Sequence, residues 1–427
     1  MTRIKVLFAG VAGAGAAAVM VAGCAAGGGP RSATVPAAVQ GGSWVVVRAP
    51  EVHGVLTAVS CPSPSSCAAV GEYYHPAPRY ALIEHWNGSA WSIVKGPPPS
   101  AHLTAGLSGV SCSGVSDCTA VGSSTRIVRM PTTSPPPVRT LVEHWNGSAW
   151  SIVKSPNPPA ASNRLTGVAC SRAWGCMAVG QSGGSMNLHV RTLAERWNRS
   201  RWVIVKSPTP RGAIYSVLSS ISCTRRSDCV AVGEYLPGGQ RQSQNHPLIE
   251  HWNGSVWTLM PSPEPPRSIA SYLSAVSCRS ASDCVAVGTV RYPHRKGSSY
   301  GGPREYTFIE RWDGSAWSIV KSPDPPGPPA DGLDGIACPA ASDCVAVGAG
   351  GRLTPPGSTD GARTLVERWN GSGWAIVPSP SPSANSGLSQ VACASASDCV
   401  AVGGFGNLNN LASPHTLIEH WNRAPGH

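Results

Sequence analysis

Cysteine is the residue type in this chain whose spacing most directly predicts chemistry. Fourteen of its 15 cysteines form pairs in which five residues separate the partners. The pairs are Cys61–Cys67, Cys112–Cys118, Cys170–Cys176, Cys223–Cys229, Cys278–Cys284, Cys338–Cys344 and Cys393–Cys399. Zinc sites usually need four ligands with gaps of about two to four residues, and no second pair accompanies each first one. We therefore predict seven disulfides, which are typical of an exported protein, and no metal site.

A glutamate also recurs once in every repeat of the chain. These residues are Glu84, Glu143, Glu195, Glu250, Glu310, Glu367 and Glu419. Catalytic carboxylates act as one asymmetric pair at one place, so a residue present in every repeat indicates a structural role. The basic residue that follows each glutamate points to the opposite face of its strand. We expect the partners of the glutamates to be backbone amides or a residue of the next repeat.

An aspartate precedes the second cysteine in five of the seven pairs. These residues are Asp117, Asp228, Asp283, Asp343 and Asp398. Aspartate in a tight turn accepts hydrogen bonds from nearby backbone groups. Calcium would need more oxygen ligands than one carboxylate per turn. We expect this set to stabilise turns, and the repeated positions predict no catalytic residue and no cofactor.

These residues recur because the chain is built from a repeat. The first cysteines of successive pairs lie 51 to 60 residues apart. Each repeat offers four short runs rich in β-branched and aromatic residues, for example Leu388–Cys393, Cys399–Gly403, Thr416–Trp421 and Trp317–Val320. The cysteine loop joins the first two runs and an Asn-Gly turn joins the last two, so each repeat is two hairpins. Seven such units predict an all-β fold, a seven-bladed β-propeller with four-stranded blades.

The two ends of the repeat region complement each other. It begins with a lone fourth strand, Trp44–Val47, and ends after a lone third strand, Thr416–Trp421. A linear array of repeats would need capping repeats instead. We therefore predict that the N- and C-terminal strands pair within one blade and close the ring.

The repeat resembles the kelch repeat over residues 42–423. The resemblance is carried by a glycine after the second strand, by Glu-[His/Arg]-Trp-[Asn/Asp] in the third, and by a Trp that opens the fourth. Most repeats have one glycine where kelch has two, although Gly403-Gly404 is an exception. The gap from Trp86 to Trp91 is shorter than in kelch, and the cysteine hairpin is foreign to it. The resemblance implies a propeller, and propellers host many unrelated activities.

The N-terminal segment resembles the signal peptide and lipobox of a bacterial, actinobacterial-type lipoprotein. Arg3 and Lys5 precede an apolar run, and Val21-Ala22-Gly23 precedes Cys24. The resemblance implies removal of residues 1–23, lipidation of Cys24 and attachment to the cell membrane through that lipid only. Residues 24–41 are rich in Gly, Ala and Pro and are typical of a flexible tether, and residues 424–427 are a short tail. We expect an extracytoplasmic, lipid-anchored monomer.

The long loops predict where a ligand binds. Both tight turns of every repeat lie on one face of the predicted propeller, so the loops between second and third strands share the other face, which we call the long-loop face. Tyrosines together with arginines are typical of recognition surfaces. The predicted ligand-binding residues on this face are Tyr73, Tyr74, Tyr80, Tyr215, Tyr235, Tyr272, Tyr292, Tyr300, Tyr306 and Arg295. Trp174 is an unusual aromatic residue on the opposite, tight-turn face.

Two functions fit these patterns. The first is a non-catalytic binding or scaffolding module for a polysaccharide or protein ligand. The second is a carbohydrate-active enzyme, a hydrolase or lyase, with its site at the propeller axis. Its carboxylates would come from Glu72, Glu234, Glu305 and Asp360, while Asp334 and Gln390 are polar departures in the first strands. The net charge of +11 does not make nucleic acid an expected partner outside the cell.

Overall fold

The computed structural model describes residues 42–74, 79–97, 103–127, 136–184, 189–239, 244–293, 303–323, 331–351, 361–407 and 413–423. These residues belong to one compact unit. The predicted signal peptide, Cys24, the tether, the tail, Tyr300, Arg295 and Asp360 lie outside the described residues. Within the described ranges, no helix is long and apolar enough to cross a membrane.

The described residues form 28 strands, which fall into four classes by position in the repeat. The first strands are β2 (Gly54–Ser63), β6 (Leu103–Gly114), β10 (Ser162–Ser171), β14 (Ala213–Arg225), β18 (Ala270–Ser280), β22 (Gly332–Ala340) and β26 (Ser386–Ser395). The second strands are β3 (Ser66–Tyr74), β7 (Asp117–Arg126), β11 (Gly175–Gly183), β15 (Asp228–Pro237), β19 (Asp283–Tyr292), β23 (Asp343–Gly351) and β27 (Asp398–Asn407). The third strands are β4 (Arg79–Trp86), β8 (Val138–Trp145), β12 (Arg191–Trp197), β16 (His246–Trp252), β20 (Arg304–Trp312), β24 (Ala362–Trp369) and β28 (Ser413–Arg423). The fourth strands are β5 (Trp91–Ile93), β9 (Trp150–Ile152), β13 (Trp202–Val205), β17 (Trp257–Met260), β21 (Trp317–Val320), β25 (Trp374–Ile376) and, at the N-terminus, β1 (Gly42–Val46).

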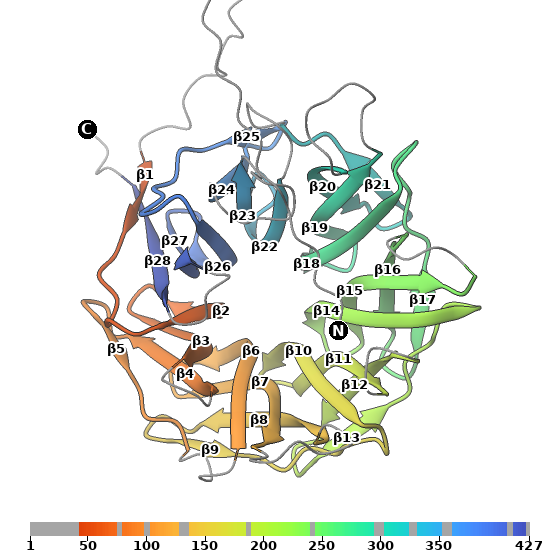
Figure 1. Cartoon of the computed structure of the whole chain (residues 1–427), viewed down its shortest axis with the longest axis horizontal. Helices are drawn as coiled ribbons and strands as arrows, with labels where there is room; N and C mark the ends of the chain where they lie inside the picture. Colours follow the sequence, from red (N-terminus) through yellow and green to blue (C-terminus); the bar gives the residue numbers. More distant parts are fainter. Residues whose placement is uncertain are drawn as a thin grey trace, which may run out of the picture. The chain divides into compact units, whose positions relative to one another are not determined.

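Antiparallel pairing joins the four classes in chain order, which gives four-stranded units that we number one (β2–β5) to seven (β26–β28 with β1). β1 completes unit seven by pairing with β28 over its whole length, with Trp44 opposite Trp421. The predicted pairing of the terminal strands is therefore present. Units two and three are linked by one parallel bridge between Ser162 and Val138. Figure 1 shows the units around a common centre, with the first strands innermost.

The second strands are buried on both faces, because each sheet packs between two others. β3 and β7 carry unbroken runs of buried residues rather than an alternating pattern. The core is accordingly shared between units: Val70 and Ile83 of unit one pack with Leu107, Val110 and Trp150 of unit two. Trp150 is thus one of the tryptophans that pack between units.

The glycine that ends each predicted second strand is required by a bulge in the first strand. In unit five the register shifts between Leu273 and Ala275 of β18. A Cβ atom built on Gly288 would lie 2.0 Å from the carbonyl oxygen of Tyr272. Only glycine allows the two strands to approach this closely.

Side-chain hydroxyls hold neighbouring first strands together. Thr57 donates to the carbonyl oxygen of Leu107 at 2.8 Å. The backbone N–H of Cys112 donates to the Ser60 hydroxyl at 3.0 Å. These bonds satisfy groups at the inner edge of each sheet, where the backbone ladder ends.

All seven predicted disulfides are present, which confirms the pairing within each cysteine hairpin. Their Cα–Cα distances are 3.9 to 4.1 Å. Seven disulfides indicate an oxidising, extracytoplasmic environment.

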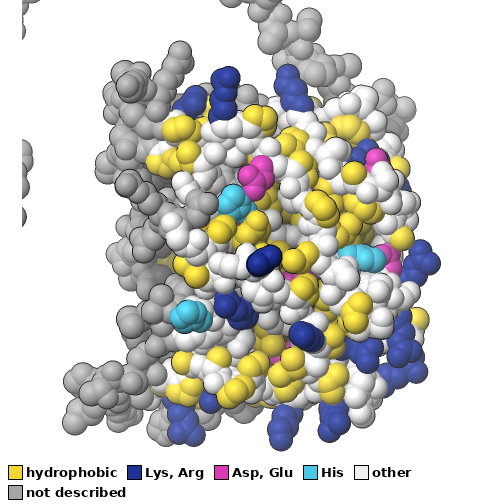
Figure 2. All heavy atoms as spheres, turned by 90° about the vertical axis from the view of Figure 1, so that its right-hand side faces the viewer, with side chains coloured by type: hydrophobic (Ala, Val, Ile, Leu, Met, Phe, Trp, Pro, Cys, Tyr) yellow, Lys and Arg dark blue, Asp and Glu magenta, His cyan; other side chains and the backbone are white. Residues whose placement is uncertain are grey.

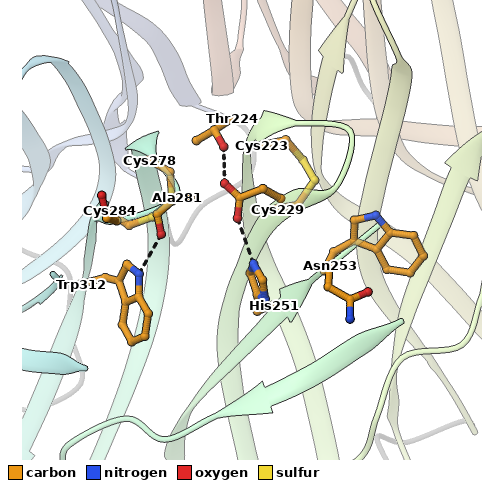
Figure 3. Close-up of polar contacts among 12 residues, drawn as sticks. Cys223, Thr224, Cys229, His251, Asn253, Cys278, Ala281, Cys284 and Trp312 are labelled. Carbon is orange, nitrogen blue, oxygen red and sulfur yellow. Dashed lines mark hydrogen bonds and ion pairs between the residues drawn. A yellow bond between two sulfur atoms is a disulfide. The ribbon is translucent and has the colours of Figure 1, made fainter. Parts of the chain in front are cut away.

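The aspartate before the second cysteine pairs with the basic residue of the third strand. In unit four, Asp228 accepts a hydrogen bond from the Thr224 hydroxyl and lies 2.9 Å from His251 Nε2 (Figure 3). In unit six, Arg368 donates to both oxygens of Asp343. We expected this aspartate to accept hydrogen bonds from nearby backbone groups, and that expectation is wrong. Its partners are side chains, and through them the aspartate connects the second strand to the third. A tryptophan also stabilises the cysteine loop. In unit five the indole N–H of Trp312 donates a hydrogen bond to the carbonyl oxygen of Ala281 (Figure 3).

The third-strand glutamates are buried, and their partners come from the link that precedes their unit. Ser155 donates to Glu195 at 2.6 Å, and Ser379 donates to Glu419 at 2.6 Å. Ser207, Ser262 and Ser322 do the same for Glu250, Glu310 and Glu367. Backbone amides or a residue of the next repeat were expected. The partner is instead a serine of the preceding link, which reads Lys-Ser-Pro at Ser155, Ser207 and Ser322 and Pro-Ser-Pro at Ser262 and Ser379.

Two glutamates lack this serine. The link before unit two carries Gly96 at the serine position, and the link before unit one carries Ala49. Glu143 Oε2 and both Glu84 oxygens are buried without a hydrogen-bond partner. A buried acceptor that is left unpaired costs free energy, so these two sites are weak points of the core.

We predict that Gly96→Ser stabilises the protein by about 1 kcal/mol, because the new hydroxyl would donate to Glu143. A Cβ atom at Gly96 would meet Ile83 and Glu143 at 3.5 and 3.6 Å, which are ordinary contacts. The measurement is the free energy of unfolding in denaturant. Gly96→Ala is the matched control, since it adds the Cβ atom without the hydroxyl. Equal stability of the two variants would contradict the prediction.

We also predict that the melting temperature falls as the pH rises from 5 to 8.5. Burial raises the pKa to about 7 for Glu84, Glu143, Glu195 and Glu419 and to about 8 for Glu250 and Glu310. The folded state thus binds more protons than the unfolded state, whose glutamates titrate near pH 4.5. The resulting stabilisation is complete below the unfolded pKa and is lost as the pH passes the folded pKa values.

One group opposes this trend. Burial lowers the pKa of His85, which destabilises the folded state as the pH falls. This single histidine is outweighed by the six buried glutamates. Calorimetry across the pH range is the test, and Glu250→Gln should flatten the slope. A melting temperature that rises from pH 5 to pH 8 would refute the assignment.

Candidate functional site

The described tyrosines lie at strand ends on the long-loop face, not in loops as predicted. Tyr73 and Tyr74 end β3, Tyr235 belongs to β15, and Tyr292 ends β19. All eight described tyrosines are half-buried. The second strands continue beyond the glycine at which the sequence pattern predicted that they end. Contacts between aromatic rings on the second and third strands stabilise this added part of the sheet.

Aromatic rings pair across the second and third strands of several units. The Tyr73 and Tyr80 ring centroids are 5.4 Å apart, and Tyr235 stacks on His246 at 5.3 Å. Tyr292 and Tyr306 meet edge to face at 5.7 Å. The structure therefore brings four of the predicted tyrosines together in two pairs, one in unit one and one in unit five. Tyr215 and Tyr272 belong instead to first strands.

The pair in unit five lines a groove of about 390 Å³, which we call the unit-five groove. Arg304 lies in it beside Tyr306, with its guanidinium carbon 5.9 Å from the ring centroid, and Arg304 Nε is buried without a hydrogen-bond partner. Lys321, at the exposed end of β21, lies on its rim. The groove thus combines two phenol rings with two cations, within the volume range of small-ligand sites.

The sequence pattern did not single out Lys321. It belongs to the Lys-Ser-Pro segment that follows several fourth strands, so a lysine at this position does not by itself indicate a binding site. Only the neighbouring tyrosine pair makes this copy different.

A second cavity of about 340 Å³ is lined by all seven first strands. Hydroxyl groups predominate at the position after the repeated leucine, as at Thr57, Ser108 and Ser274. Asp334 replaces the hydroxyl in unit six, and its side chain is exposed to the cavity. Enclosure by the surrounding protein raises the pKa of Asp334 to about 6. Gln390 also lines the cavity, but its amide oxygen accepts from the backbone N–H of Val391.

Three other carboxylates considered for an enzyme, those of Glu72, Glu234 and Glu305, already have partners. Tyr74 and Arg79 both donate to Glu72, at 2.6 and 3.2 Å. Asn245 donates to Glu234, and Arg291 pairs with Glu305, each at 2.6 Å.

These three glutamates belong to β3, β15 and β20, which are strands of three different sheets. Among the described residues, no group of three or more His, Cys, Asp and Glu side chains could hold a metal ion.

Figure 2 shows more Lys and Arg than Asp and Glu side chains on the side that it draws, with apolar side chains scattered among polar ones. A surface of this kind favours polar or charged ligands over a large apolar partner.

No protein-family model and no curated protein matches the chain. Among solved structures, Sqt1 from Chaetomium thermophilum is 11% identical, with 88% of this chain and 97% of that one covered and a TM-score of 0.49. A protein of unknown function from Dyadobacter fermentans is 9% identical, with coverage of 89% and 98% and a TM-score of 0.46. A GH74 xyloglucanase from Xanthomonas campestris is 11% identical, with coverage of 86% and 54% and a TM-score of 0.49. At these values, similarity assigns the chain neither an activity nor a partner.

Proposed function

We propose that the chain is a closed, seven-bladed β-propeller that acts as a non-catalytic binding or scaffolding module at the cell surface. Its ligand is a polysaccharide or a protein, bound on the long-loop face. Support for closure comes from the pairing of β1 with β28 and from the contacts of β26 with β2. The hydroxyl bonds between successive first strands act in the same direction.

The observation that carries the binding function is the unit-five groove. Phenol rings supply flat apolar surface and a hydroxyl at low entropic cost, which suits both sugars and peptides. Arg304 and Lys321 add donors for hydroxyl or carboxylate oxygens. The carboxylates of Glu72, Glu234 and Glu305, by contrast, are held by their own neighbours.

The test is a screen of the purified protein against bacterial cell-wall polysaccharides and surface-protein extracts, followed by substitution of the groove. Tyr292→Leu with Tyr306→Leu should weaken binding of a hit about tenfold or more, since single anchors often contribute over 1 kcal/mol. Leucine is preferable to alanine because both tyrosines pack against the core of unit five. The matched control is Tyr73→Leu with Tyr80→Leu in unit one. A groove variant that binds as well as the unsubstituted protein would refute the assignment.

A lipid anchor completes the proposal. It is motivated by the lipobox-like Val21-Ala22-Gly23-Cys24 segment. Mass spectrometry of the mature protein should find an N-terminal Cys24 that carries diacylglycerol. A mature chain that retains Arg3, or that begins elsewhere without lipid, would exclude the anchor.

The alternative is a carbohydrate-active enzyme with its site at the propeller axis, and Asp334 is the observation that favours it. A carboxyl group with a pKa of about 6 is poised for proton transfer near neutral pH. If incubation with a bound polysaccharide releases products, and Asp334→Asn abolishes the release without loss of binding, the enzyme function holds instead.

A further inference from the structure

Unit three departs from the common residues of the repeat at several positions on the tight-turn face, and three of these residues meet at one place. The Asn-Gly-Ser turn becomes Asn198-Arg199-Ser200. The glycines at this position in five other units have φ between 93° and 99°, and Arg199 keeps the left-handed conformation at φ 76°. An L side chain disfavours this region, and such outliers concentrate at functional sites.

The cysteine loop of unit three carries the other two of these residues. Gly175, at φ 92°, stands where five units have the aspartate. Arg172 stands two residues after the first cysteine, and its guanidinium lies so close to Gly114 of unit two that a Cβ atom there would be 2.2 Å from Nη2. Arg199 in turn donates to the carbonyl oxygen of Ala173 at 2.6 Å, which connects the two turns.

A cavity of about 510 Å³ opens at these residues, between units two and three. Two indole rings, those of Trp197 and Trp202, line it with their centroids 5.9 Å apart. Arg172 and Arg199 line it from unit three, and the pair of Asp117 with His144 lines it from unit two.

The same place between units five and six is nearly filled, with about 10 Å³ of free space. There Arg311 lies over the ring of Trp369 at 5.8 Å, and Arg279 occupies the cysteine loop. Unit two carries the smaller His144 and Ser113 at these two positions. The cavity is open because His144 and Ser113 do not reach into the space that Arg311 and Arg279 fill between units five and six. Two arginines of unit three lie at its edge.

The cavity has an excess of positive charge. No carboxylate of the described chain lies within ion-pair distance of Arg172 or Arg199. Burial acts to raise the pKa of Asp117, but hydrogen bonds from Ser113 and His144 and the nearby charges of His144 and Arg172 lower it overall. Asp117 is thus an anion already held by its own neighbours, and the two guanidinium groups are available to an external anion.

We propose that this cavity binds an anionic sugar unit of a glycan, with the carboxylate or phosphate on Arg172 and Arg199 and the sugar ring against Trp197, which the buried Trp202 supports from behind. Guanidinium groups match the planar, bidentate geometry of carboxylate and phosphate oxygens. Indole rings offer the flat apolar surface that a sugar ring covers. The site lies on the face opposite the unit-five groove, and it does not depend on binding there.

The test measures quenching of tryptophan fluorescence by a trisaccharide of galacturonic acid, by the neutral galactose trisaccharide and by glucose 6-phosphate. The acidic trisaccharide should bind at least about tenfold more tightly than the neutral one, and added salt should weaken it. Tighter binding of glucose 6-phosphate would identify phosphate as the preferred anion of the same site. Absence of binding by both anionic sugars, or equal affinity for the neutral one, would overturn the proposal.

Two variants separate binding from folding. Arg199→Gly restores the repeated turn and should raise the melting temperature while it weakens acidic-sugar binding about tenfold or more. Arg172→Ser should also weaken acidic-sugar binding. Serine is the residue at this position in units five and seven, as Ser280 and Ser395. The matched control is Arg225→Ser, because Arg225 is the exposed arginine at the same position of unit four.

Unchanged binding in the double variant Arg172→Ser with Arg199→Gly would refute the site. Tyr292→Leu with Tyr306→Leu should leave acidic-sugar binding intact. Loss of binding in that variant alone would assign the acidic sugar to the long-loop face and would equally refute the site.

Discussion

Burial of both faces of every sheet is the constraint on which this structure depends. The second strands carry apolar residues without alternation, so each sheet has two apolar faces. Each unit therefore needs a neighbouring unit on both sides to bury them. Clusters of buried residues accordingly join consecutive units, as where Leu273 and Phe308 of unit five pack with Val232 of unit four. A four-stranded unit has no stable existence outside such an array.

This constraint also explains why the polar groups of the repeat are so regular. A sheet that is buried on both faces has few places for an ionisable side chain, and each one requires a partner at a fixed position. The serine of a link supplies the partner of the buried glutamate, and the third-strand base supplies that of the aspartate. Glu84 and Glu143, which lack the serine, indicate that the array tolerates two unpaired sites.

Departures from the repeat are consequently the most informative positions for function. Replacing a repeated residue sacrifices a contact that most other units keep, as at Gly175, where the strand-joining aspartate of five units is absent. The tyrosine pair in unit five and the arginines of unit three follow this rule on opposite faces. A lone substitution is weak evidence, but changes that meet at one cavity from two units are coordinated in space.

Much of the local structure could be predicted from the amino-acid sequence. The spacing of the cysteines predicted the disulfides, the turn residues predicted the hairpins, and the complementary ends of the repeat region predicted the pairing of Trp44 with the last strand. The sequence could not identify the Ser155 partner of Glu195, which lies 40 residues away in another unit, nor that the tyrosines are half-buried at strand ends. The cavities at Arg199 and Tyr292 were decided only by the tertiary structure, because an empty volume depends on which side chains from two adjacent sheets fail to fill it.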